Sequence, residues 1–459
     1  MSREEASPVP GLTVQFVRSI QDVTPELTKG LEKADYDKYV KTVAKRIEKL
    51  QKSMEKKNPG KKILIKDFFG GNQYLLFVME VYTDVRFVGA PPSSIGKFGG
   101  DTDNWMWPRH TGDFSIFRVY AAPDGVTPAD YSPENVPYQA PVYLTVSAKG
   151  YKEGDYTMIM GFPGSTNRYM TTYEIDEMLD VTNPNRILIR GERQDILSED
   201  MAASDKVRIQ YSDKYAVSSN YWKNAIGMSK AVRKLGVRDQ RSEQEAAFTK
   251  WAEADPARAE YLRALPLIAQ SKEISVPIAS DIQVLAEAVL MSIDVATIAV
   301  TLNGMLPELS ELSADEATAA IAAVYKDYNE ATDIKVTKRM IELLMEMVSP
   351  ANMPEFITAD VEGRFNGNVE EYIKWLYETS VYANEEKFEK AFAAGNVPAD
   401  DPALAIFNTT CAKYKALYAS KAEADKMFNE GHKLYIKGLL EMDADGKHYP
   451  DANFTIRLT

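Results

Sequence analysis

The residues best suited to chemistry gather in one short segment, residues 99–118. The segment reads Gly-Gly-Asp-Thr-Asp-Asn-Trp-Met-Trp-Pro-Arg-His-Thr-Gly-Asp-Phe-Ser-Ile-Phe-Arg, so tryptophans, carboxylates and an asparagine precede an apolar run. Loops that carry polar and aromatic side chains on a β scaffold are where binding and catalysis concentrate. A tight Asp/Gly turn with a tryptophan packed beneath it has the same composition, and composition alone favours neither interpretation.

Asp113 stands directly before residues 114–120, which alternate like a strand. In trypsin-like barrels the acid of the catalytic triad occupies this kind of position, where it orients the imidazole of the base. Residues 153–164, Glu-Gly-Asp-Tyr-Thr-Met-Ile-Met-Gly-Phe-Pro-Gly, are similar to the strand and turn that open the second barrel of bacterial trypsin-like proteases. Because two weak signals occur in the right order, we predict that Asp113 is a triad acid.

A triad also needs a base and a nucleophile, and this sequence offers no credible one. His110 lies three residues from Asp113, whereas two-barrel proteases take their histidine and aspartate from separate loops. His432 falls in a charged helix and His448 in a polar linker, which predicts surface positions for both. No Gly-x-Ser-x-Gly or Gly-x-Ser-Gly-x turn marks a nucleophile.

Composition excludes several classes of protein. The 459 residues are 45% hydrophobic and 26% charged, which is an ordinary globular composition and room for two to four domains. No apolar run has spanning length, so we expect no membrane span, and the net charge of −13 argues against a nucleic-acid partner. Cys411 is the only cysteine and no histidine pair has HExxH spacing, so we expect neither a metal nor another cofactor.

Hydrophobic periodicity divides the chain into a β part and a helical part. Residues 11–165 are mostly β, with one helix at residues 34–57, and such short strands separated by turn signals predict a barrel or sandwich. The predicted strands are residues 12–18, 62–69, 74–82, 85–88, 114–120, 142–146 and 156–160.

From about Thr171 the spacing becomes helical. Ser313 and Thr332 stand at predicted helix starts, where short polar side chains satisfy free backbone amides. Residues 451–459 alternate again and predict a return to β structure. The predicted helices are residues 256–271, 282–301, 314–328, 337–347, 370–379 and 421–442.

Five segments of the chain resemble one family. Residues 89–120, which begin Gly-Ala-Pro-Pro-Ser-Ser-Ile-Gly-Lys-Phe, are similar to the signature of the dipeptidyl-peptidase 7 and 11 serine exopeptidases. The likeness runs from end to end. Its other segments are Phe69-Gly-Gly-Asn-Gln-Tyr, Met160-Gly-Phe-Pro-Gly-Ser, Ser219-Asn-Tyr-Trp-Lys-Asn and residues 449–459.

The resemblance implies an α+β fold, a partial trypsin-like double β-barrel with a large inserted all-helical domain. The barrel domain would cover residues 1–166, the helical cap domain residues 167–447, and the return to the barrel residues 448–459. The implied activity is that of a serine-type dipeptidyl-peptidase, which releases dipeptides from free peptide N-termini without a metal or cofactor. The implied setting is the bacterial periplasm or cell surface, with an export signal upstream of Met1 and a homodimeric parent.

By the same resemblance, Asp113 is the triad acid, and Asn104, Trp105 and Asn220 hold the N-terminal amine of the substrate. A free α-amino group has a pKa near roughly 8, so it arrives largely as a cation. Amide oxygens can accept its N–H bonds, and an indole can offer a ring face. Without the resemblance, Asn220 would be interpreted as a surface amide and Trp222 as a core aromatic.

The sequence departs from the family in what it lacks. The family's triad histidine lies upstream of Met1, and its nucleophilic serine and the residue that reads the cleaved side chain lie downstream of Thr459. We therefore expect a fragment that hydrolyses nothing by itself and whose dipeptide preference cannot be predicted. The alternative is a trimmed, non-catalytic relative that binds peptide N-termini. A third hypothesis, a helical interaction module with a β appendage, predicts no such binding.

Overall fold

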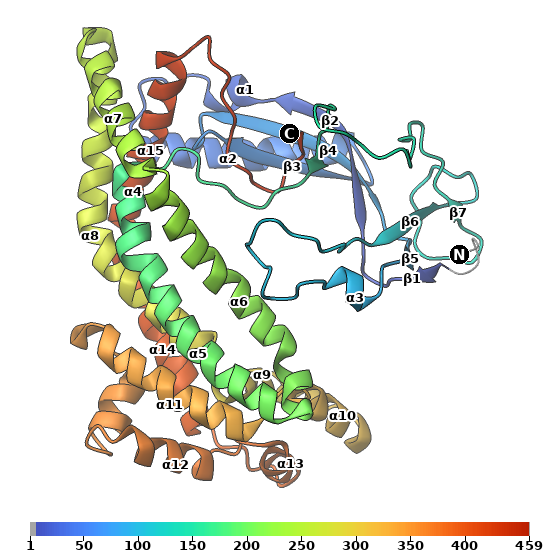
Figure 1. The fold of residues 1–459 in the computed structure, drawn as a ribbon, viewed down its shortest axis with the longest axis vertical. Coiled ribbons are helices and arrows are strands. Elements are labelled where there is room, and N and C mark those ends of the chain that lie inside the picture. Colours follow the sequence, from blue (N-terminus) through green and yellow to red (C-terminus); the bar gives the residue numbers. More distant parts are fainter. Residues whose placement is uncertain (1–5, 459) are drawn as a thin grey trace.

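The structure is a computed structural model and describes residues 6–458. It is a mixed α+β protein in which small antiparallel sheets stand beside a much larger helical unit (Figure 1). The β part comes first in the chain, the helical part begins after residue 170, and the chain end returns to the sheets. The predicted division into a β part and a helical part is therefore confirmed.

Three long strands form the first sheet in the order β2-β4-β3. They are β2 (Val14–Asp22), β3 (Lys61–Phe68) and β4 (Gln73–Tyr82), and both pairings are antiparallel. Because side chains alternate along a strand, the central strand buries residues on both faces. Leu76 and Val78 pack toward helix α2 (Tyr36–Lys57), while Phe77 and Met79 form a second cluster.

The remaining strands are shorter. A four-stranded antiparallel sheet has the order β1-β5-β6-β7, and a separate pair joins β8 to β9, so the predicted return of the chain end to β structure is confirmed. Two short helices, α1 (Thr24–Thr28) and α3 (Ser93–Gly96), accompany the sheets. The strands are β1 (Ser7–Pro8), β5 (Val85–Gly89), β6 (Ile116–Ala121), β7 (Val136–Pro137), β8 (Met160–Gly161) and β9 (Arg457–Leu458).

Two predicted strands are wrong. Residues 142–146 have no regular structure, and of residues 156–160 only the last enters a strand. No backbone hydrogen bond joins residues 142–146 to another described segment, and the apolar side chains point into solvent, Val146 being 94% exposed. A strand needs a neighbour for its backbone groups and a cover for its apolar face, and the described chain provides neither here.

Most of the chain from residue 172 onward is helical, and the large core lies among these helices. All six predicted helices overlap helical segments, and those predicted for residues 314–328, 370–379 and 421–442 lie within three residues of the expected bounds. The helix predicted for residues 256–271 begins as a 3-10 turn and continues to Val284, and the helix predicted for residues 337–347 begins earlier, at Glu330. The helices are α4 (Thr172–Glu177), α5 (Asn183–Ala203), α6 (Asp205–Lys234), α7 (Val237–Glu253), α8 (Ala264–Val284), α9 (Asp294–Leu309), α10 (Ala314–Tyr325), α11 (Glu330–Met347), α12 (Val369–Thr379), α13 (Glu385–Ala393), α14 (Pro402–Ser420) and α15 (Ala422–Met442), with 3-10 or π turns at Met178–Thr182, Pro256–Arg263, Leu285–Leu290, Pro350–Asn352 and Phe356–Glu362.

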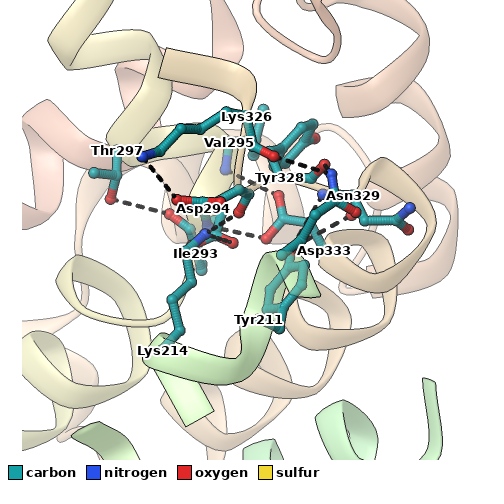
Figure 2. A network of polar contacts seen from close by, with 12 residues as sticks. Tyr211, Lys214, Ile293, Asp294, Val295, Thr297, Lys326, Tyr328, Asn329 and Asp333 are labelled. Carbon is teal, nitrogen blue, oxygen red and sulfur yellow. Dashed lines mark hydrogen bonds and ion pairs between the residues drawn. The ribbon is translucent and has the colours of Figure 1, made fainter. Parts of the chain in front are cut away.

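The helix predicted for residues 282–301 is broken. A buried carboxylate from α11, that of Asp333, accepts hydrogen bonds from the backbone amides of Asp294 (2.9 Å) and Val295 (2.9 Å), and this starts α9. Figure 2 shows Asp333 facing this first turn, while Lys214 of α6 reaches the Asp294 carboxylate at 2.7 Å. Because the cap comes from a residue about forty positions away, local spacing could not indicate the break.

Helix starts follow the expected chemistry, with one correction. The Ser313 side chain accepts from the Glu316 amide, and Glu316 reaches back to Ser313, so α10 begins with the predicted polar cap. The cap of α11 is Asn329, whose side chain accepts from the Thr332 amide at 3.1 Å, so Thr332 lies inside the helix. The prediction at Thr332 was wrong by three residues.

Helix α15 fastens the helical part to the β part. Lys433 donates to the Tyr39 hydroxyl at 2.9 Å and to the carbonyl of Gly71, and Asn72 donates to the Lys433 carbonyl at 2.9 Å. Lys426 pairs with Asp37 at 2.8 Å nearby. Burial lowers the pKa of Lys433 to about 8. This junction is one place where the units meet through side chains, and the candidate site is another.

Close packing of α15 against α8 gives a first testable expectation. A Cβ added at Gly431 would lie 2.7 Å from the Ala264 carbonyl oxygen, so Gly431→Ala must push the helices apart and should lower the free energy of unfolding by about 2 kcal/mol. Gly227→Ala on α6 is the matched control. Nothing lies within 4 Å of a Cβ there, so it should stabilise the protein by about 0.5–1 kcal/mol. Urea denaturation measures both, and effects of the same sign would contradict this packing.

No single described helix has the length and hydropathy of a membrane span. The segments Pro256–Leu290 and Asp294–Leu309, which meet at a bend of 77°, satisfy those criteria only as a pair.

Candidate functional site

The candidate site is built on the loop that joins α3 to β6. The loop is tied at its base, because the Gly112 amide donates to the Ile95 carbonyl at 3.1 Å and the Thr111 hydroxyl donates to the Phe98 carbonyl at 2.7 Å. From this base it extends across the space beside the sheets toward α6 (Figure 1). Residues 99–110 are therefore presented to the helical unit by the β unit.

The loop meets α6 at Asn220. The Asn220 side-chain oxygen accepts two hydrogen bonds, one from Asn104 Nδ2 at 3.1 Å and one from Trp105 Nε1 at 3.0 Å. Asn220 lies 116 and 115 positions away from these partners in the sequence. Three of the four predicted site residues are thus brought together at the boundary between the two units.

Trp105 is held in an uncommon backbone conformation. Its φ is 59°, in the left-handed region that a residue with a large side chain seldom adopts without support from its surroundings. Its side chain is 56% exposed, and that of Trp107 is 92% exposed. The alternative of a tryptophan packed beneath a tight turn is therefore wrong, and both rings are available to a ligand.

Both amide oxygens proposed to receive an amine already have partners. Asn220 Oδ1 serves two donors, and Asn104 Oδ1 accepts from Arg109 Nη1 at 3.2 Å. A cationic amine would have to displace one of these donors or bind beside them. The contact between the loop and α6 is therefore a set of hydrogen bonds that a ligand could exchange for its own.

Asp113 lies apart from this cluster. It is exposed, three residues before β6, and has no hydrogen bond to Asn104, Trp105 or Asn220. Asp113 is linked to Asn104 and Trp105 through the base of the loop, since it directly follows Gly112, whose amide donates to the Ile95 carbonyl. Within residues 6–458 no group of His, Cys, Asp and Glu side chains forms a candidate metal site.

The histidines differ in part from expectation. His110 is exposed, as a loop residue would be. His432 is not a surface residue, since its ring stacks on Phe428 with centroids 5.2 Å apart and its Nε2 lies 3.2 Å from the Tyr169 carbonyl. His448 is also partly covered, with Nε2 2.6 Å from the Asp443 carbonyl. The contact of His432 with Tyr169 spans 263 positions and has no signal in the sequence, whereas Phe428 and Asp443 are sequence neighbours of their histidines.

Sequence reasoning also missed three residues beside Asn220. The Ser219 hydroxyl donates to Asp101 Oδ1 at 2.7 Å, and Lys223 Nζ lies 3.2 Å from Asp101 Oδ2 and donates to the Asp101 carbonyl. The available signal was helical spacing, since residues 219, 220 and 223 share one side of a helix. Trp222 has a structural role, because its Nε1 donates to the Ile187 carbonyl on α5 at 3.0 Å.

The fold and the site define an α+β protein in which a side chain of the helical unit, that of Asn220, is hydrogen-bonded to a loop of the β unit. The chain belongs to the peptidase S46 family, because the sequence model of that family matches residues 1–459. It is 42% identical over 476 residues to dipeptidyl-peptidase 7 of Phocaeicola vulgatus, and the alignment covers 100% of this chain and 65% of that protein. It is 36% identical over 480 residues to the Asp/Glu-specific dipeptidyl-peptidase of Porphyromonas gingivalis, covering 100% of this chain and 66% of that protein.

A solved structure shows the same likeness. The crystal structure of Porphyromonas endodontalis DPP11 in complex with the dipeptide Arg-Glu superposes with a TM-score of 0.84 at 33% identity, over 100% of this chain and 67% of that one. The chain therefore spans about two thirds of the length of the relatives it matches. The predicted family resemblance is confirmed.

Proposed function

We propose that this chain forms the greater part of a serine-type dipeptidyl-peptidase that releases dipeptides from free peptide N-termini. The family membership and the names of the relatives support the reaction class. The observation that carries the proposal is the contact between Asn220 and the pair Asn104 and Trp105. It places amide groups and an indole at one boundary, directly before the loop base that leads to Asp113.

The proposed fold is a trypsin-like double β-barrel into which the helical cap, residues 167–447, is inserted. Residues 142–146 and 156–160 fit this proposal, since they have strand-like sequences and exposed apolar side chains. Strands supplied by the extra length that the relatives possess would give these segments partners. Such a barrel would also bring the histidine and serine that the described residues do not offer as a base and nucleophile.

In the proposed reaction, Asp113 orients the imidazole of the base and stabilises the imidazolium that forms when the serine attacks the peptide carbonyl. The amine of the substrate binds where the loop meets α6, so the scissile bond lies a fixed distance from the N-terminus. A chain interior has no free amine and would collide with the helical unit. The product is therefore a dipeptide. The same proposal places the protein in the periplasm or at the cell surface, as a homodimer.

Asn220→Ala tests the amine site. In a full-length protein with the flanking sequence of its relatives, the variant should lower kcat/KM on peptides with a free N-terminus by about 10- to 100-fold, the usual effect of losing a hydrogen bond to a charged group. Asn224→Ala, one turn further along α6 and without a hydrogen bond to another described residue, is the control and should behave as wild type. Unchanged kcat/KM in Asn220→Ala would refute the assignment.

A non-catalytic peptide-binding relative remains the second candidate, because the described residues offer an acid without a base or nucleophile. The full reading frame separates the two candidates. Flanking sequence with a histidine loop upstream and a Gly-Asn-Ser-Gly turn downstream supports the peptidase. A start and stop codon at the bounds of this chain would support the binding protein, which should bind peptides with a free N-terminus but not their N-acetylated forms in calorimetry.

A further inference from the structure

Asp101 connects the loop to α6 more tightly than any predicted site residue does. Both oxygens of its carboxylate are used, one by the Ser219 hydroxyl at 2.7 Å and the other by Lys223 Nζ at 3.2 Å. Lys223 also donates to the Asp101 carbonyl. Three interactions from one helix thus converge on a single residue of the loop.

The same residue belongs to the turn that presents the site. The Asp101 carbonyl accepts from the Asn104 amide at 3.1 Å, so Lys223 binds the turn itself as well as its side chain. The preceding Gly99 has a φ of +77°, and a Cβ there would lie 1.9 Å from an Asp103 carboxylate oxygen. Glycine is therefore required at this position of the turn. The turn sets the positions of Asn104 and Trp105, which follow it in the chain.

Burial distinguishes this contact from an ordinary surface ion pair, which contributes little. Ser219 is fully buried, and the side chains of Lys223 and Asp101 are 21% and 33% exposed. On α6, Ser219 and Lys223 flank Asn220, and the three residues lie within about 100° of the helix circumference. A shift of Asp101 along the helix would therefore move Asn104 and Trp105 away from Asn220.

We propose that Asp101, held by Ser219 and Lys223, is a positioning residue that sets the register between the loop and α6. This inference rests on the proposed function, because the register matters for binding the amine at Asn104, Trp105 and Asn220. Asp101 acts through these residues and does not itself bind the substrate. Loss of the contact should weaken recognition of the N-terminus and leave the chemical step nearly unchanged.

The test uses Asp101→Asn and Lys223→Met in the full-length protein. Both should raise KM for peptides with a free N-terminus, and the inhibition constant of a product dipeptide, by about tenfold, as expected when a hydrogen-bonded charge is removed. The turnover number should change less than about threefold. Inactivation by a small sulfonyl fluoride, which reacts with the serine without using the amine site, should keep its wild-type rate. Lys223→Arg should restore most of the lost affinity.

Two exposed residues of α6 supply matched controls. Lys230→Met and Asp213→Asn lie on exposed parts of α6, have no polar contact to another described residue, and should match wild type. An unchanged KM in Asp101→Asn, or equal losses of turnover and sulfonyl fluoride reactivity, would overturn the positioning role. A wild-type protein that cleaves N-acetylated peptides as well as free ones would instead refute the proposed function.

Discussion

Asp113→Ala in the full-length protein is expected to lower kcat by about 10⁴ while KM changes only a few-fold. The expected loss is large because, in the proposed triad, nothing else would hold the imidazole in the tautomer that accepts the serine proton. Asp113 lies between the tied loop base and β6, three residues before the strand begins, and its side chain is exposed, which fits the proposed role. Steady-state kinetics on a chromogenic dipeptide substrate measure both constants.

Asp113→Asn separates charge from shape. It keeps the size of the side chain but removes the negative charge, so its kcat should fall nearly as far as that of the alanine variant. Glu153→Ala, an exposed carboxylate elsewhere in the β part without a hydrogen bond to a described residue, is the control and should retain wild-type turnover. Near-normal turnover in Asp113→Ala would remove Asp113 from the catalytic machinery.

Asp333→Ala should lower the free energy of unfolding by about 3–5 kcal/mol. The Asp333 side chain is 1% exposed and accepts from the amides that start α9 and from the Tyr377 hydroxyl at 2.7 Å. Alanine would leave both backbone amides without this acceptor, and the Tyr377 hydroxyl would keep only the Thr337 hydroxyl, at 2.9 Å, as a partner. Urea denaturation of the purified protein measures the loss, and the exposed Asp213→Ala, expected within about 0.5 kcal/mol of wild type, is its control.

The same carboxyl should leave a signature in the pH dependence of stability. Burial, and after it the neighbouring Asp294 carboxylate, raises the pKa of Asp333 to about 7, against about 3.9 in the unfolded chain. Between those values the folded state keeps a proton that the unfolded state has lost. The contribution of Asp333 to the free energy of unfolding therefore falls as pH rises, by at most about 1.4 kcal/mol per unit, and levels off above about pH 7.

Asp333→Asn cannot ionise, so its difference from wild type should carry this pH dependence. Subtracting the free energy of unfolding of Asp333→Asn from that of wild type should give a value that decreases from pH 5 to 7 and stays constant from pH 7.5 to 8.5. A difference that is constant over the whole range would contradict the raised pKa.

Local pattern predicted the elements whose structure depends on neighbours in the sequence. The helix at Tyr36–Lys57 and the strands β3 and β4 lie within two residues of expectation, because their apolar spacing matches the face they bury. Residues 142–146 have an equally good strand pattern but no partner among the described residues. The break before α9 escaped prediction because Asp333, a distant residue, caps that helix.

The site shows the same division. Composition singled out the loop of residues 99–118, and family resemblance added Asn220, which helical spacing alone would have left as a surface amide. The contact of Asp101 with Ser219 and Lys223 was not predicted, because nothing in either segment indicates that they meet across 118 to 122 positions of sequence. Ion pairs between distant segments depend on the packing of whole units.

The length of helix α6 makes the contact at Asn220 sensitive to the orientation of the helix. It has 30 residues, and Asn220 lies fourteen residues from Lys234, which is roughly 21 Å along the axis. A tilt of about 5° at that end would displace Asn220 by about 2 Å, enough to break hydrogen bonds that fail beyond about 3.5 Å. The angular tolerance of the site is therefore only a few degrees. If the proposed amine site is correct, substitutions that change how α15 packs on α8, such as Gly431→Ala, should weaken substrate recognition by changing the angle of α6, although Gly431 has no contact with Asn104, Trp105 or Asn220.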